Sequence, residues 1–373
     1  MIVLLVPATP SSFAGSPTFP VLPALGRDPA PAGGWLDAAF GWVAGSVDAA
    51  VLAAMQVIVD RIVAPAPEDV ARIRRSAAAF LEPEVQRAPE AFLDAVRRDG
   101  ALRSRETYRG PIADGIRMDR QIDWDASDPM HVEQWLHGDG GARATVVAVH
   151  GFGMGSTRRD AYALFAHRWF REGLDVALYT LPLHGTRTPS DARFSGERFA
   201  VPDIAAMNRV LRQALHELAA LVTMLRAETG APVGVIGLSM GALLASLLAS
   251  RDPELDFVVP IAPPVCLGDI AWRFFERSRR RPEIASAALD RDELRASFRV
   301  HSPLAYQLRV PRDRVLLVAG RGDRIVPPEH AHALWRHWGE PDMFWFSGSH
   351  LAPVGRRSAE DAIARHLRRC GIS

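Results

Sequence analysis

The stretch APVGVIGLSMGALLASLLAS, residues 231–250, decides the fold. The apolar run VGVIG predicts a strand and MGALLASLLAS predicts a helix, with Ser239 at the junction. Such a sharp turn forces a serine into a strained conformation that exposes its hydroxyl. Side chains at Gly237 and Gly241 would collide with the crossing strand or helix, which explains both glycines. The context predicts that Ser239 is a nucleophile, and an ordinary N-cap serine is the alternative.

Further apolar runs surround this stretch and predict buried strands: TVVAVHG, LDVALYTLPLHG, LDFVVPIAPP and DRVLLVAGRGD. Strands that are apolar on both faces are typical of a parallel sheet covered by helices on both sides. Helical patterns alternate with them over residues 159–173, 205–230, 241–250 and 327–339. We therefore expect a doubly wound α/β domain whose reactive residues gather at the carboxyl ends of the strands.

A serine nucleophile needs a general base and a carboxylate that orients the base. In a strand-ordered site the acid follows a later strand and the histidine follows the last one. Asp323 lies just after DRVLLVAG, and His350 lies just after DMFWF, so both stand in the required order. Asp269 follows another predicted strand and is the alternative acid. The histidine spacings predict no metal site.

The tetrahedral intermediate of such a reaction needs two N–H donors that form an oxyanion hole. One is expected from Met240, the residue after the nucleophile. The loop HGFGMGS, residues 150–156, follows an earlier strand and offers Phe152 as the second donor, with Gly153 as its rival. A phosphate-binding loop is disfavoured because the segment lacks the Lys-Ser/Thr end of a P-loop.

The motifs HGFGMG, GLSMG, GRGDRIVPP and GSH, in this order on these strands, resemble the α/β-hydrolase superfamily on its serine esterase, lipase and thioesterase side. The resemblance covers about residues 105–373. It implies the α/β-hydrolase fold with a mainly parallel eight-stranded sheet, a triad of Ser239, Asp323 and His350, and no cofactor. Ala242 departs from the pattern, because many lipases have another glycine there.

Two segments are candidates for substrate recognition. A cap insertion at about residues 264–312 carries Trp272 and Phe275, which could cover an acyl chain. The loop LPLHGTRTPSDARFSGERF puts His184 and Arg187 near the expected pocket mouth. The predicted function is cleavage of a small-molecule carboxylic ester or thioester through an acyl-enzyme. The alternatives are a peptidase-type serine hydrolase and a non-catalytic binding protein with the same fold.

The region before the hydrolase domain divides into two parts. Residues 1–34 are rich in Pro, Gly, Ser and Ala and predict a poorly ordered arm. Residues 35–104 predict a helical extension with one long apolar helix and two shorter ones. A membrane span would bury Asp48 near its middle, at a cost of roughly 2.5–3.5 kcal/mol. We expect the long helix to pack on the protein, with membrane contact as the less favoured alternative.

Composition limits the partners and the compartment. The chain has 44 basic and 43 acidic residues, so no overall field attracts nucleic acid or an anionic membrane. Two cysteines are too few for a disulfide framework, which predicts a reducing cytoplasm. Membrane association or export is the alternative. The sequence gives no indication of the oligomeric state.

Overall fold

The computed structural model describes residues 35–62, 67–94, 102–124, 128–138, 140–201, 203–277, 289–352 and 354–372, and the predicted arm, 1–34, lies outside them. The described strands are β1 (Ser104–Ile112), β2 (Gly115–Ile122), β3 (Met130–His137), β4 (Thr145–Val149), β5 (Asp175–Thr180), β6 (Val233–Leu238), β7 (Val258–Ile261), β8 (Leu316–Gly320) and β9 (Asp342–Phe346). The described α-helices are α1 (Trp35–Ile62), α2 (Pro67–Leu81), α3 (Pro83–Arg87), α4 (Pro89–Asp94), α5 (Thr157–Ala163), α6 (Ala166–Arg171), α7 (Ile204–Thr229), α8 (Met240–Ala249), α9 (Leu267–Arg277), α11 (Arg291–Ser297), α12 (Pro328–His337) and α13 (Arg356–Arg369).

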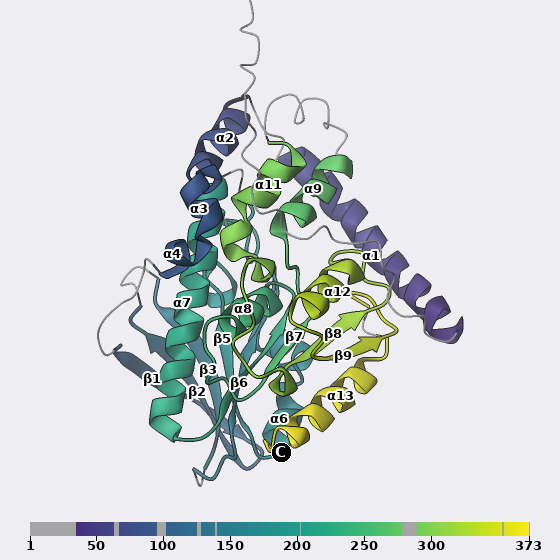
Figure 1. Ribbon diagram of the computed structural model, residues 1–373. Helices are drawn as coiled ribbons and strands as arrows, with labels where there is room; N and C mark the ends of the chain where they lie inside the picture. Colours follow the sequence, from purple (N-terminus) through teal and green to yellow (C-terminus); the bar gives the residue numbers. More distant parts are fainter. Residues whose placement is uncertain are drawn as a thin grey trace, which may run out of the picture.

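The strands form one sheet in the order β1-β2-β3-β5-β4-β6-β7-β8-β9 (Figure 1). The six strands from β5 to β9 in this order pair in parallel, whereas β1, β2 and β3 pair antiparallel with their neighbours. The chain leaves β4 toward β5 on one side and later returns to β6 on the other. This reversal is the switch point at which doubly wound sheets place their sites. The predicted α/β fold class is confirmed.

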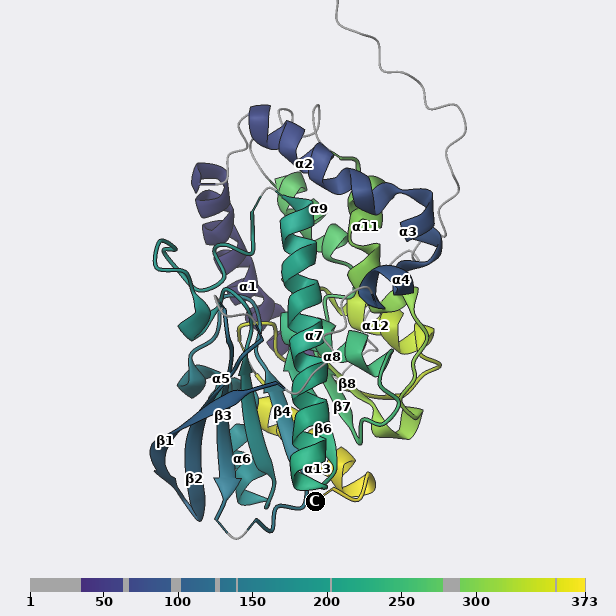
Figure 2. The same ribbon diagram turned by 90° about the vertical axis from the view of Figure 1, so that its left-hand side faces the viewer.

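Helices cover both faces of the sheet, as its apolar strands require. One core lies under α7, α8 and α12 and includes Leu211, Leu243 and Leu334. The other lies under α5, α6 and α13 and includes Trp169 and Ile363. Figure 2 shows α7 running lengthwise across the first face. Burial on both faces therefore holds the strand ends in fixed positions.

Helix α7 follows the predicted pattern closely because both of its ends are capped. The Asp203 side chain accepts a hydrogen bond from the backbone N–H of Ala206, and Gly230 ends the helix with φ 62°. The single helix predicted over residues 159–173 is wrong, because Phe165 takes φ 59° and separates α5 from α6. The chain turns at a left-handed residue that is not glycine, so no glycine in the sequence marks the break.

One edge of the sheet is antiparallel. The segments GIRMDRQIDW and MHVEQWLHG have the alternation that predicts an antiparallel pair. They form β2 and β3, and their pairing is confirmed, with Gly115 opposite His137 and Ile122 opposite Met130. Strand β1 was missed because most of its residues are exposed and show no buried alternation. With β1 the described sheet has nine strands, which corrects the eight implied by the resemblance.

The N-terminal helices pack on the rest of the molecule. Helix α2 buries Ile73, Ala77 and Phe80 and contacts α7 and α11. Figure 1 shows α2 close to α9 and α11, so helices from the N-terminal extension and from the predicted cap meet above the sheet. Three short helices occupy 67–94 where two were predicted, because Pro83 and Pro89 each start a new one.

None of the helices in the described ranges combines the length and apolar character needed to cross a bilayer.

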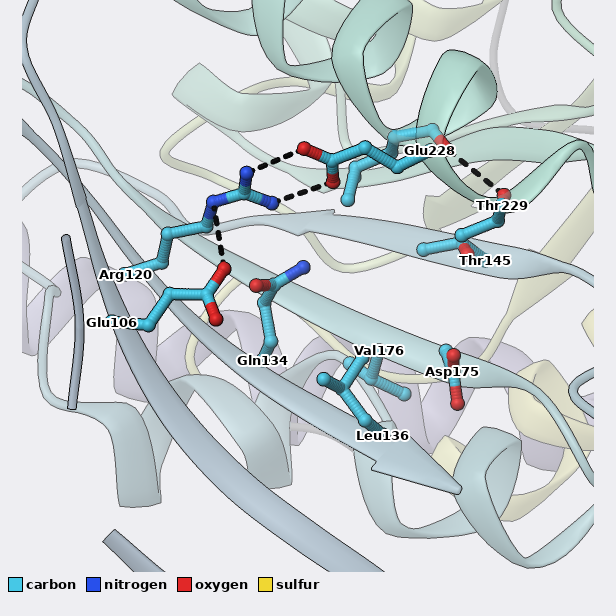
Figure 3. A pocket seen from close by; sticks show the side chains of 10 residues that line it. Glu106, Arg120, Gln134, Leu136, Thr145, Asp175, Val176, Glu228 and Thr229 are labelled. Carbon is cyan, nitrogen blue, oxygen red and sulfur yellow. Dashed lines mark hydrogen bonds and ion pairs between the residues drawn. The ribbon is translucent and has the colours of Figure 1, made fainter. Parts of the chain in front are cut away.

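A polar cavity of about 150 Å³ lies at the end of the sheet where β4 and β5 begin. Figure 3 shows Arg120 between Glu106 and Glu228, and its guanidinium donates to both Glu228 oxygens at 2.5 and 2.7 Å. Thr145 and Asp175 line the same cavity at the first residues of their strands. The cavity is therefore at the opposite end of the parallel strands from Ser239 and takes no part in that site.

Acidification is expected to destabilise this fold. Burial lowers the pKa of His150 and His301 to about 3 and that of His330 to about 4, from 6.5. Between these values and pH 6.5 the unfolded chain binds more protons than the native state, so each histidine removes about 1.4 kcal/mol of stability per pH unit as the pH falls. Asp160 opposes the trend because burial raises its pKa to about 6.

Urea unfolding at pH 7.0 and pH 5.5 measures the loss of stability. His301→Gln should reduce the change of the unfolding free energy with pH by the contribution of one histidine. Equal free energies of unfolding at the two pH values would contradict the expectation.

Candidate active site

The turn between β6 and α8 carries Ser239 in a backbone conformation that few side chains adopt. Its φ is 54° and its ψ is −115°, which stores roughly 1–3 kcal/mol of strain. The Ser239 N–H donates to the carbonyl of Ile261 at 2.8 Å, and its carbonyl accepts from the N–H of Leu243 at 3.0 Å. These bonds tie the strained residue to β7 on one side and to α8 on the other.

Two glycines make the turn possible by letting backbones touch. A Cβ on Gly237 would lie 2.2 Å from the Gly241 oxygen, and one on Gly241 would lie 2.1 Å from the Val149 oxygen. Real Cβ atoms essentially never come closer than 3.0 Å to another heavy atom. The structure thus confirms that a side chain at either glycine would collide with its neighbours, which belong to β4 as well as to α8.

The structure brings Asp323 and His350 together. His350 Nδ1 lies 2.7 Å from Asp323 Oδ2, and both side chains are largely buried, at 9% and 2% exposure. The other Asp323 oxygen accepts from the N–H groups of Ile325 at 3.0 Å and Val326 at 2.7 Å. One carboxylate oxygen is therefore fixed by its own loop, which aims the other at the imidazole. Asp323 follows β8 and His350 follows β9, so both lie at the carboxyl edge of the sheet with Ser239.

Burial and the charges around the pair shift the pKa values of both Asp323 and His350. Burial raises the pKa of Asp323, and the neighbouring imidazole and the Val326 hydrogen bond offset only part of that effect. Burial lowers the pKa of His350, but the charge and hydrogen bond of Asp323, with a further contribution from Asp48, outweigh it and raise the pKa overall. The imidazolium that forms when His350 accepts a proton is thus stabilised by the carboxylates around it.

Asp269, the alternative acid, lies in a different environment. It is buried at the start of α9, where its oxygens pair with Arg291 at 2.8 Å and Arg295 at 3.3 Å. These ion pairs join α9 to α11. The carboxylate beside His350 is Asp323.

The loop after β4 lies against Ser239. A Cβ on Gly151 would lie 3.2 Å from the Ser239 Cβ, so this glycine allows the loop to approach the serine closely. Phe152 follows directly, and Met240 begins α8, whose first N–H groups have no partner within the helix. Gly153, the rival donor, is exposed and takes φ 74°. Met240 therefore adjoins the serine in the chain, and Phe152 follows the glycine that approaches it.

His184 supports this loop from behind. Its ring is fully buried, its Nδ1 lies 2.8 Å from the Pro182 oxygen, and its ring packs edge-on against Phe152 with a centroid distance of 5.7 Å. Burial also lowers its pKa, so the ring is neutral near pH 7. Because the ring is buried against Phe152, we propose a supporting role for His184 in place of the predicted substrate contact.

Arg187 is also engaged in the interior. Its guanidinium pairs with Glu217 at 2.6 Å and with Asp128 at 2.7 Å, and its side chain is 3% exposed. Tyr179 donates to the same Glu217 at 2.6 Å. Because these partners occupy the guanidinium, we propose a structural role for Arg187 in place of the predicted substrate contact.

The cap residues lie on α9, which begins soon after β7 ends. Trp272 is half-buried, packs against the core beneath the cap, and donates from its indole N–H to Glu276 at 2.9 Å. The side chain of Phe275 lies outside the described part of the chain. Within the described residues no group of His, Cys, Asp and Glu is placed to hold a metal ion.

The contacts of Asp48 were not predicted from the sequence, in which it is a charge inside an apolar helix. The carboxylate is fully buried and lies against the loops of Asp323 and His350. An acidic residue near the middle of a mostly apolar helix was the available signal. The position of Asp48 indicated that the helix packs on the protein, but it did not indicate which atoms the carboxylate would contact.

Comparison with known proteins gives a family match over the part of the chain that contains Ser239. Residues 140–291 match the family model of serine aminopeptidase, S33. Two uncharacterized proteins of Mycobacterium tuberculosis, from strains CDC 1551 / Oshkosh and ATCC 25618 / H37Rv, are each 29% identical over 236 residues. Each alignment covers 62% of this chain and 55% of the relative, so the chain spans about half the length of these curated relatives.

Solved structures show the same fold. Acetyl xylan esterase 1 from Thermoanaerobacterium sp. JW/SL YS485 aligns with TM-score 0.58 and 15% identity over 77% of this chain and 94% of its own. The acetyl xylan esterase from Paenibacillus sp. R4 aligns with TM-score 0.55 and 15% identity, over 76% and 92%. At this identity the likeness concerns the fold alone.

Gly241→Ala is expected to disrupt the turn. The new methyl would lie 2.1 Å from the Val149 oxygen, so β4 or α8 must shift, at a cost of about 3 kcal/mol or more. Gly230→Ala is the control without a close contact: nothing lies within 4 Å of its Cβ, and its penalty is the left-handed φ of 62° alone, so it should cost roughly 1–2 kcal/mol. Urea unfolding measures both, and equal losses would show that the close contact is not required.

Proposed function

We propose that this chain, which belongs to the α/β-hydrolase superfamily, is a serine hydrolase that cleaves a carboxylic ester or thioester. The observation that carries the proposal is the strained Ser239 turn at the same sheet edge as the 2.7 Å pair of His350 and Asp323. The family match over residues 140–291 supports it, because that family is named for a serine enzyme.

In the proposed mechanism His350 accepts the Ser239 proton as the serine oxygen attacks the ester carbonyl. Asp323 holds the imidazole in the required tautomer and stabilises the imidazolium. The backbone N–H groups of Met240 and Phe152 stabilise the tetrahedral oxyanion, each by about 2.7–4 kcal/mol. His350 then protonates the departing alcohol or thiol, which leaves an acyl group on Ser239. Water, activated by the same histidine, releases the acid.

The strain at Ser239 fits this role. A serine held as an ordinary helix cap would keep an extended conformation and bond its side chain to the first turn. Here φ is positive, and the side chain makes no cap hydrogen bond to α8. The turn thus presents the hydroxyl and does not use it to begin the helix.

An amide bond is the second candidate substrate, because the matched family model is named serine aminopeptidase. The same triad serves both reactions, and the leaving group distinguishes them. Assays with p-nitrophenyl esters and with aminoacyl p-nitroanilides in parallel separate the two. Greater catalytic efficiency on the anilides would favour the peptidase.

Ser239→Ala should abolish both ester turnover and labelling by a fluorophosphonate probe, since it removes the attacking oxygen. Asp323→Asn should lower kcat by roughly 10⁴-fold, because the amide stabilises the wrong imidazole tautomer. Asp269→Asn is the matched control, and it should leave kcat near the wild-type value. Undiminished labelling of Ser239→Ala, or a larger loss in Asp269→Asn than in Asp323→Asn, would contradict the assignment.

The cap is expected to select the acyl group by burial. If α9 covers an apolar acyl chain, each added methylene contributes about 0.8 kcal/mol, which is a threefold to fourfold rise in kcat/KM. The two esterases with the same fold are named for acetyl groups, so acetate is the natural start of a p-nitrophenyl ester series. Trp272→Ala should flatten the rise while sparing acetate.

Trp272→Phe is the control that keeps an aromatic side chain, and Glu276→Gln removes only the charge of the indole's partner. A preference for acetate that all these proteins share would show that α9 is not an acyl lid. The proposal would then change to a substrate with a small acyl group.

A further inference from the structure

A second fully buried carboxylate, Asp48, lies beside the proposed triad and comes from helix α1. Among the described residues its two oxygens accept four hydrogen bonds, from the N–H groups of Arg324 at 3.0 Å, His350 at 2.9 Å and Leu351 at 3.0 Å, and from the Ser349 hydroxyl at 2.8 Å. One carboxylate thus spans the loop that carries the acid and the loop that carries the base.

Helix α1 can reach these loops because glycine faces them. A Cβ on Gly45 would lie 2.7 Å from the Gly322 oxygen, and one on Gly322 would lie 2.1 Å from the Gly41 oxygen. Gly41 and Gly45 are four residues apart, so they stand on one side of the helix, one turn above the other. Asp48 continues that side three residues later. This close approach places its short side chain among backbone N–H groups.

Asp48 and Asp323 hold different parts of the histidine. Asp48 accepts from the backbone N–H groups of His350 and of the next residue, Leu351, while the His350 ring is held by Asp323. The charge of Asp48 also raises the pKa of His350. In the described part of the chain, the charged groups around this segment include Arg321, Asp323 and Arg324 of the acid loop, Asp37 and Asp48 of α1, and Arg273 of α9, which donates to the Arg324 carbonyl.

We propose that Asp48 is a positioning residue of the hydrolase: it fixes the backbone of His350 and Arg324 relative to each other and adds negative charge behind the imidazole. This inference rests on the proposed function. It makes α1, which lies outside the segment that resembles the superfamily, a part of the active site. Asparagine cannot replace the carboxylate, because its amide nitrogen would face an N–H donor.

Asp48→Asn should lower kcat/KM on a p-nitrophenyl ester by about tenfold to a hundredfold, mainly through kcat, because small displacements of a catalytic group have effects of this size. It should also move the acid limb of the pH profile of kcat/KM to lower pH, because the lost charge no longer favours the imidazolium. The readouts are the pH profile, the split between kcat and KM, and Tm.

Asp37→Asn is the matched control. Asp37 lies on the same helix and accepts from the hydroxyl of Ser347 in the same loop, but it makes none of the four contacts at His350 and Arg324. Its variant should lose some stability and keep the wild-type acid limb. Ser349→Ala removes one donor to Asp48 and keeps the charge, so kcat should fall while the acid limb stays in place.

Two results would overturn the inference. One is an Asp48→Asn protein with lower Tm but wild-type kcat and acid limb, which makes the contact a simple anchor for α1. The other, if Asp48→Asn does not fold, is wild-type kcat in Ser349→Ala.

Titration of the His350 ring by NMR, assigned with His350→Gln, tests the charge effect without any turnover. If wild-type protein neither hydrolyses esters nor reacts with the fluorophosphonate, the proposed function fails, whereas an unshifted His350 titration in Asp48→Asn contradicts only the inference about Asp48.

Discussion

The positive φ of Ser239 is the constraint on which the rest of the site depends. A left-handed residue between a parallel strand and a helix is stable only where its neighbours allow three backbones to meet, here those of β4, β6 and α8. Two glycines supply that space, and the hydrogen bond to Ile261 ties the turn to β7. The energy stored at one residue is thus offset by the packing of four central elements, each buried on both sides.

The same geometry explains why so much of the fold could be predicted. Buried parallel strands read as continuous apolar runs, and the glycines at 237 and 241 mark a turn with few alternatives. The relative order of Asp323 and His350 follows from strand order alone. Strand β1 could not be found this way, because an exposed edge strand has no burial pattern. The break at Phe165 had no sequence signal, because its positive φ occurs at a residue type that rarely adopts it.

The predicted substrate contacts show a different limit of sequence reasoning. A histidine and an arginine on a loop near a pocket mouth look like ligands, yet His184 packs behind Phe152 and Arg187 pairs with Glu217 and Asp128. Whether a polar side chain faces a cavity or the interior depends on partners far away in the sequence. Glu217 lies 30 residues beyond Arg187 and is fully buried, and unpaired burial of either charge would be costly. Removal of either partner would therefore leave an uncompensated charge in the interior.

Asp48 and the loops of Asp323 and His350 satisfy each other's hydrogen bonds. A buried carboxylate is tolerated when hydrogen bonds replace the lost water, and this one finds them in backbone N–H groups of two loops. Those N–H groups would otherwise need other partners, since buried backbone donors are nearly always paired. Helix and loops therefore depend on each other: α1 needs the loops to satisfy its carboxylate, and the loops need α1 to satisfy their backbone. Because Asp48 binds the backbone of His350, a displacement of α1 would also displace the histidine, which is why we propose that this helix contributes to the active site as well as to the packing.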